Sequence, residues 1–197
     1  MDLMDSVEEF EPVAKVFDEL GIDYQVGGSV ASSVHGMPRG TQDIDVEADI
    51  RAEHIEPLVE KLKARFVIFP EMIRDALRYQ RAFNLLPYDS ISKIDVFVRK
   101  NRAFDQQAAG RRLKDVQMDD GSVFPYYVDS VEDTVLRKLE WYRMGGEISD
   151  QKWKDVQTVL KAQVFDLDLD YLEHWAVELN VADLLARALD ESGVKQQ

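Results

Sequence analysis

The chain has 197 residues, of which 38 are Asp or Glu and 24 are Lys or Arg, so that its formal net charge is −14. The length suits one domain, or one domain with a small helical appendage. The acidic balance argues against a broad nucleic-acid-binding surface, although a local basic groove for one RNA end stays open. The lack of cysteine excludes disulfides and thiolate zinc sites. Because no signal pattern and no apolar run of about 18 residues occurs, we expect a cytoplasmic protein without membrane contact.

The first 129 residues alternate helical and strand patterns. Apolar residues at helical spacing predict a helix over 6–20, which opens with a capping box at Ser6 and Glu9 and ends at Gly21. The further elements expected are strands at 23–26, 43–48 and 66–69, helices at 29–34, 53–64, 71–79 and 104–113, a β pair of 82–86 with 91–99, and a hairpin of 116–118 with 123–128 around Asp-Asp-Gly-Ser.

From Ser130 onward the period is helical throughout. The helices expected here cover 131–143, 150–162, about 168–179 and 181–190. Mixed strands followed by helices predict an α+β fold, with a mixed β-sheet core and flanking helices over 1–129 and a C-terminal helical bundle over 130–197 that packs on this core.

The candidate site lies in residues 26–47, VGGSVASSVHGMPRGTQDIDVE. Gly27-Gly28-Ser29 forms a turn into a short helix, whose free N–H groups and positive dipole end suit a phosphate. Asp43 and Asp45 alternate with an isoleucine on the next strand, so both carboxylates point to one face. Such a pair repels unless a cation lies between its members, which indicates a hard divalent cation. The phosphate cradle and the carboxylates together predict a nucleoside triphosphate site.

The Gly27-Gly28-Ser29 turn, followed after thirteen residues by Asp43-Ile44-Asp45, resembles the signature of the nucleotidyltransferase superfamily, which has the polymerase-β-like fold. The inner pattern around His35-Gly36 and Arg39–Asp45 is similar to small bacterial members of the AbiEii/MNT-like branch. The resemblance implies a third carboxylate on a later strand, for which Asp95 is the candidate. It also implies the transfer of NMP from an NTP donor to an acceptor hydroxyl, with a possible role in a toxin–antitoxin system.

In this hypothesis the three aspartates are both the catalytic and the metal-binding residues. Two Mg²⁺ (or Mn²⁺) ions can stabilise the attacking and leaving oxygens of nucleotidyl transfer. Asp43 and Asp45 would hold the metal bound to the triphosphate, and Asp95 would help to hold the second and assist deprotonation of the acceptor. The structural alternative is a set of solvated carboxylates on the polar face of a strand.

Six residues are candidates for nucleotide binding: Gly27, Gly28, Ser29, Arg39, Thr41 and Lys138. Ser29 is alternatively a helix cap, and Arg39 is alternatively a salt-bridge partner of a surface acid. Lys138 falls within the apolar stripe of helix 131–143, so its ammonium should meet a carboxylate or a phosphate unless it extends into water. In the family resemblance, the segment Leu136–Leu139 and the pair Lys154-Asp155 loosely match two late helices of AbiEii-like proteins.

Other polar and aromatic residues are interpreted more conservatively. We expect Glu47 to be a satellite of the aspartate pair, His35 to be structural, and Asn84 to face solvent or to contact a base or ribose. The three tryptophans lie at helical spacing among aliphatic residues, which indicates core positions for Trp141, Trp153 and Trp175.

An alternative function is a nucleotide-binding or toxin–antitoxin partner protein that has the fold but little or no turnover, which the acidic surface motivates. A metal-dependent phosphohydrolase is less favoured because His35, His54 and His174 are widely spaced. The sequence leaves open whether the acceptor is a tRNA or other RNA end, a protein or a small molecule. It also leaves open a homodimer or an antitoxin partner.

Overall fold

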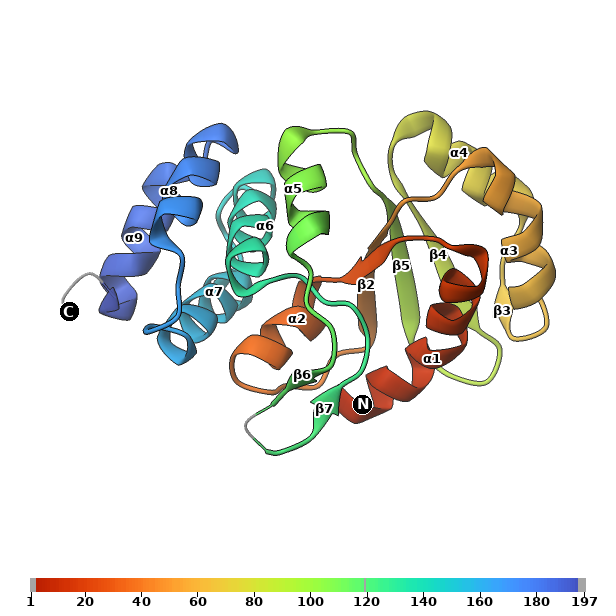
Figure 1. Ribbon diagram of the computed structural model, residues 1–197, viewed down its shortest axis with the longest axis horizontal. Helices are drawn as coiled ribbons and strands as arrows, with labels where there is room; N and C mark the ends of the chain where they lie inside the picture. Colours follow the sequence, from red (N-terminus) through yellow and green to blue (C-terminus); the bar gives the residue numbers. More distant parts are fainter. Residues whose placement is uncertain (1–2, 119, 195–197) are drawn as a thin grey trace.

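The computed structural model, which describes residues 3–118 and 120–194, joins a mixed five-stranded sheet to a bundle of helices (Figure 1). The strands are β1 (Tyr24–Val26), β2 (Asp43–Ala48), β3 (Phe66–Val67), β4 (Ala82–Pro87), β5 (Lys93–Val98), β6 (Val116–Gln117) and β7 (Val123–Phe124). The helices are α1 (Leu3–Leu20), α2 (Gly28–His35), α3 (Ile55–Leu62), α4 (Pro70–Tyr79), α5 (Ala103–Arg111), α6 (Val131–Met144), α7 (Asp150–Ala162), α8 (Leu169–Glu178) and α9 (Ala182–Ser192), with a 3-10 turn η1 at Ala52–His54.

The large sheet has the strand order β1-β2-β5-β4-β3. Its central strands β2 and β5 run parallel, whereas β1 is antiparallel to β2 and β4 is antiparallel to β5. In the parallel register Asp45 lies opposite Asp95. Because side chains alternate along a strand, the odd-numbered residues of β2 and β5 share one face, while their even-numbered neighbours are buried in the core. The predicted α+β fold is therefore confirmed, and it places two aspartates side by side.

Buried apolar residues form two clusters. The first packs the sheet against α1, α2, α3 and α4, and the second joins α6, α7, α8 and α9. Phe104 and Ala108 of α5 belong to the second cluster, although they precede the helical region in the chain. In Figure 1 the bundle lies on the left and the sheet on the right, with α5 and α2 between them. The division into 1–129 and 130–197 stays a prediction.

Several predicted boundaries need correction. Helix α1 begins at Leu3 and already runs through Ser6, so the start predicted there is wrong. Leu3 is buried and extends the apolar pattern of the helix toward the N-terminus. The strand predicted over 123–128 is only Val123–Phe124, although Val128 forms isolated bridges with Val26 and Leu113. Asp119, in the predicted hairpin turn, lies outside the described residues. No helix in the described part of the chain is both long and apolar enough to cross a bilayer.

Candidate active site

The turn between β1 and α2 packs directly against the carboxylate of Asp45. The Gly27 N–H donates to the backbone carbonyl of Asp45 at 2.8 Å. Gly28 has a φ of +57°, and a Cβ built there would overlap the Asp45 carboxylate. Only glycine combines a left-handed backbone conformation with so close an approach to the Asp45 carboxylate. Gly27 is the N-cap residue of α2 and has no side-chain cap, so the alternative role of Ser29 as the helix cap is wrong.

The three aspartates lie on one face of the central strands. Asp45 and Asp95 face each other in register, while Asp43 lies opposite Lys93 and is exposed. Burial, and then the nearby Asp95 charge, raises the pKa of Asp45 above its ordinary value. The site therefore concentrates negative charge at the point where the turn approaches the sheet.

Two neighbours already engage Asp95. The Lys93 Nζ lies 2.8 Å from Asp95 Oδ2 and 3.9 Å from Asp43 Oδ1, and its hydrogen bond with Asp95 raises the pKa of Lys93. Asn84, on the adjacent strand, donates its amide N–H to Asp95 Oδ1. Asn84 thus faces the third aspartate while staying partly exposed, and its contact with a base or ribose stays a prediction.

The aspartates fit a divalent cation by their chemistry and by the face they share. Carboxylate oxygens are the ligands that Mg²⁺ and similar hard cations prefer, and a cation would relieve the repulsion from Asp95 that adds to burial in raising the pKa of Asp45. Within residues 3–118 and 120–194, however, no three His, Cys, Asp or Glu side chains are arranged as a metal-binding group. The Lys93 ammonium lies beside Asp95 and Asp43, so a cation bound by all three aspartates would have to displace it.

A cleft of about 460 Å³ extends from the turn along the open face of the sheet, with α6 and α7 as its opposite wall. Gly27, Gly28, Ser29 and Asp45 line one part of it. The residues that line its walls include Arg39, Glu47, Phe97, Asp129, Thr134, Arg137, Lys138, Trp141, Met144, Lys152 and Asp155. Thr41 is not among the lining residues, and its hydroxyl donates to the Asp43 carbonyl at 3.0 Å.

Arg39 and Lys138 converge on the carboxylate of Asp155 in α7. Arg39 donates to both Asp155 oxygens, at 3.2 and 3.0 Å, and also to the Ser29 hydroxyl at 2.7 Å. The Lys138 Nζ lies 2.7 Å from Asp155 Oδ2. Burial alone would raise the pKa of Asp155, but these hydrogen bonds hold it below its ordinary value. Lys138 meets the carboxylate that its burial predicted, and it does not extend into water.

Helix α6 presents one face to the helical bundle and another to the cleft. Val135, Leu136, Leu139 and Tyr142 pack into the bundle. Thr134, Arg137, Lys138 and Trp141, at spacings i, i+3, i+4 and i+7, line the cleft instead. This second stripe is visible in the sequence, but sequence reasoning assigned Lys138 and Trp141 to the apolar stripe.

The core position predicted for Trp141 is wrong, because this side chain is 45% exposed and packs edge-on against Phe97 with ring centroids 5.7 Å apart. Trp153 is buried, and Trp175 packs against the bundle core, as predicted.

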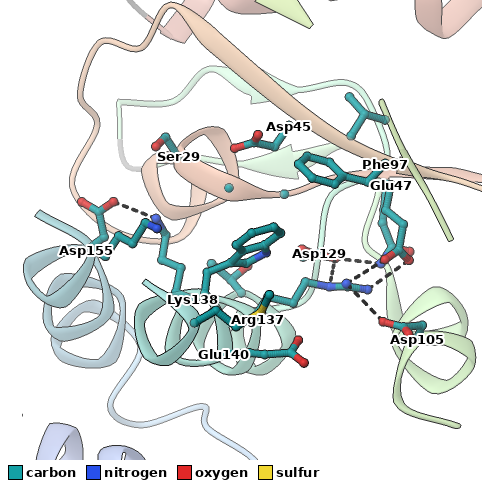
Figure 2. Close-up of a pocket in the computed structure, with 18 of the residues that line it drawn as sticks. Ser29, Asp45, Glu47, Phe97, Asp105, Asp129, Arg137, Lys138, Glu140 and Asp155 are labelled. Atoms are coloured by element: carbon teal, nitrogen blue, oxygen red, sulfur yellow. Dashed lines mark hydrogen bonds and ion pairs between the residues drawn. The ribbon is translucent and has the colours of Figure 1, made fainter. Parts of the chain in front are cut away.

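A second charged cluster centres on Arg137, which also lines the cleft (Figure 2). Arg137 contacts Glu47 at 2.7 Å, Asp105 at 3.4 Å and Asp129 at 3.5 Å. Glu47 lies one pleat beyond Asp45 on the same face, as predicted, and it pairs with Arg99 at 3.3 Å as well as with Arg137, so it ties the sheet to α6.

Asp129 is a residue that sequence reasoning missed. Burial raises its pKa to about 7 even though the Arg137 charge opposes the shift. Its Oδ1 accepts a 2.8 Å hydrogen bond from Gln25, and its Oδ2 lies 2.9 Å from where a Cβ of Gly27 would be. His35 Nε2 lies 2.7 Å from the Asp129 carbonyl oxygen, which agrees with the structural role predicted for His35.

Comparison of the sequence identifies no relative, since no protein-family model matches the chain and no curated protein matches it. Solved structures do match in shape. The crystal structure of ANT(2″)-Ia in complex with adenylyl-2″-tobramycin has a TM-score of 0.59 and 12% identity, covering 89% of this chain and 97% of that one. The solution structure of the antibiotic-resistance factor ANT(2″)-Ia has a TM-score of 0.54 and 15% identity, covering 97% of both chains.

An antigenic nucleotidyltransferase-like protein from Paracoccidioides brasiliensis has a TM-score of 0.52 and 18% identity, covering 94% of this chain and 93% of that one. At these identities the likeness is one of fold. The chain therefore has the nucleotidyltransferase fold that the Gly-Gly-Ser turn and the aspartate pair indicated.

Proposed function

We propose that the protein is a Mg²⁺-dependent (or Mn²⁺-dependent) nucleotidyltransferase that moves NMP from an NTP to an acceptor hydroxyl. One observation carries the proposal: the Gly27-Gly28-Ser29 turn packs on Asp45 in a cleft whose opposite wall supplies Lys138. The fold shared with ANT(2″)-Ia, which was solved with an adenylylated product, supports the same reaction class.

The phosphates of the donor would lie at the N-terminal end of α2. Backbone N–H groups of Gly28 and Ser29 and the Ser29 hydroxyl are available there as donors, and Arg39 already reaches the same hydroxyl. Lys138 adds a positive charge from the opposite wall. Lys152 is a further candidate that sequence reasoning missed: it lines the cleft and has no ion pair among the described residues.

The aspartates supply the other half of the site. Asp43, Asp45 and Asp95 would hold the divalent cation, which when bound stabilises negative charge on the attacking and leaving oxygens. The acceptor oxygen forms a bond to the α-phosphorus, and the bond from that phosphorus to the bridging oxygen breaks. Pyrophosphate leaves with the bonding electrons, and Asp95 accepts the acceptor proton once Lys93 has withdrawn.

A second candidate function is nucleotide binding with little or no turnover. The specific observation in its favour is the engagement of Asp95 by Lys93 and Asn84, which leaves the proposed proton acceptor occupied. If Lys93 stays in place when nucleotide binds, the third carboxylate is unable to act.

Calorimetric titration with each NTP, with and without Mg²⁺, tests the site, and incubation with NTP labelled at the α-phosphate tests transfer. We expect micromolar, metal-dependent binding that is lost in the Asp43→Ala/Asp45→Ala variant. Labelled RNA, protein or small-molecule product from mixtures of acceptors would establish transfer. Binding without any product would favour the second candidate, and a failure of every NTP to bind would remove both.

The narrower assignments remain proposals. These are the AbiEii/MNT-like branch, a toxin–antitoxin role, a homodimer or antitoxin partner, and a cytoplasmic location. The acceptor is likewise left as an RNA end, a protein or a small molecule.

A further inference from the structure

We propose that Trp141 and Phe97 form a subsite on which the base of the donor nucleotide stacks. This inference rests on the proposed function, because it takes the phosphate end of the cleft as given. The inference names side chains that would hold the base of the nucleotide, whereas the turn and the aspartates account only for the phosphates and the cation.

Trp141 is unusual among the tryptophans of the chain. Trp153 is 8% exposed in the bundle core, whereas Trp141 is 45% exposed, and it lines the cleft beside Lys138 on the same face of α6. Single exposed rings are common on protein surfaces, but a ring exposed inside a cleft is positioned to contact a ligand, since ligand pockets are lined largely by apolar and aromatic side chains. Phe97 supports the ring from the sheet through an edge-on contact at 5.7 Å. The ring is therefore held in place with much of its surface open to the cleft.

Both walls of the cleft place the ring one step beyond the phosphate residues. On the sheet, Asp45 lines the cleft and pairs in register with Asp95, and Phe97 follows Asp95 by two residues on the same face, about 6.6 Å further along the strand. On α6, Trp141 follows Lys138 by three residues, a rise of about 4.5 Å. In a nucleotide, the ribose separates the phosphates from the base by a distance of this order. A nucleotide with its phosphates between Asp45 and Lys138 thus brings its base to Phe97 and Trp141.

The charges at this end of the cleft favour a neutral ring over a cationic ligand. Glu140 precedes Trp141 and lines the cleft, but Arg102 donates to both of its carboxylate oxygens. Asp105 is likewise held by Arg102 and Arg137. Lys152 lies 6.0 Å from the Trp141 ring centroid, which adds positive charge rather than negative. An amine-rich ligand would find aromatic faces here, but the neighbouring carboxylates of Glu140 and Asp105 are already paired with arginines.

Stacking predicts a particular specificity. Every base has a π face, so an aromatic platform accepts all four bases and binds the larger purines more tightly. We therefore expect ATP and GTP to bind more tightly than CTP and UTP, and we expect this difference to depend on Trp141.

Calorimetry with ATP and with inorganic tripolyphosphate, both with Mg²⁺, separates the base from the phosphates. Trp141→Ala should weaken ATP binding about tenfold and leave tripolyphosphate binding unchanged. Trp141→Phe should retain most of the ATP affinity, which also guards against a general effect of truncating the side chain. Phe165→Ala removes an 85% exposed aromatic ring outside the cleft and should change neither titration.

Two outcomes would overturn the inference while leaving the proposed function standing. Either Trp141→Ala weakens neither ligand, as expected if the ring contacts only the acceptor, or it weakens ATP and tripolyphosphate equally, as expected if the substitution merely disturbs the fold. If neither ligand binds the unmodified protein, the proposed function fails, and this inference fails with it.

Discussion

Asp155 connects the two walls of the cleft at the end where the phosphates of the donor would bind. Its carboxylate accepts hydrogen bonds from Arg39, Lys138 and Gln151, and its side chain is only 7% exposed. The partner Lys138 is 10% exposed on the same measure. Removal of one member of a buried ion pair leaves the other charge without compensation, which costs far more than the pair itself contributes.

We therefore expect Asp155→Ala to lower the free energy of unfolding by about 3 kcal/mol. Addition of Lys138→Met should recover part of this loss, because the uncompensated ammonium is then gone. Urea unfolding of the single and double variants measures both effects. Asp166→Ala, at an exposed aspartate beyond the end of α7, serves as the control and should stay within about 0.5 kcal/mol. A loss of stability at Asp155 no larger than this control would contradict the argument.

Residues joined by local spacing could be predicted from the sequence, whereas spacing alone did not predict residues joined across the chain; Asp95 was placed with Asp43 and Asp45 through the family resemblance. The turn and the aspartate pair are local, so their shared site followed from strand alternation. Asp129 and Arg137 meet Gln25 and Glu47 across about a hundred residues, and no spacing rule connects them. Trp141 was misassigned because α6 carries two stripes, and the apolar one is the more familiar signal.

At the scale of secondary structure, the connection from β1 to α2 sets the geometry of the site. Its backbone must enter the left-handed region at Gly28 and approach Asp45 closely at the same point. An alanine at this position would pay about 1–2 kcal/mol for its positive φ. Its Cβ would also clash with the Asp45 carboxylate.

Gly28→Ala should therefore destabilise the protein by about 2 kcal/mol and abolish NTP binding. Gly110→Ala is a matched control, because Gly110 lies in α5 with nothing within 4 Å of an added Cβ. This control should gain about 0.5 kcal/mol from helix propensity and bind NTP normally. Thermal unfolding and calorimetry check the pair. Normal NTP binding by Gly28→Ala would show that the close approach to Asp45 is not needed.

Elements with a strong periodic pattern were predicted almost completely. Strand β2 has the predicted bounds of 43–48, since its apolar residues alternate without interruption. The hairpin of β6 and β7 is shorter than predicted, because Tyr126 and Val128 pack on the first core and Val128 bridges to Val26 and Leu113 instead of extending the ladder. Contacts made in three dimensions override local propensity there.

At the scale of the whole molecule, the site lies between two hydrophobic clusters. Ser29 and Asp45 belong to elements of the sheet cluster, whereas Lys138, Trp141 and Asp155 belong to helices of the bundle. Ion pairs also cross the cleft, from Arg39 to Asp155 and from Glu47 to Arg137. A ligand held by both walls must therefore stabilise both clusters together.

Thermal unfolding tests this coupling. At a concentration of Mg²⁺-ATP one hundred times its Kd, binding to the folded state adds about 2.7 kcal/mol, which corresponds to a rise in Tm of about 5–10 °C for a chain of this size. If calorimetry resolves separate transitions for the two clusters, both should move upward. The Ser29→Ala/Lys138→Met variant weakens the contact with each wall, so its shift should be much smaller. A shift of one transition alone would mean that a single cluster holds the nucleotide and that the opposite wall of the cleft does not contribute to binding.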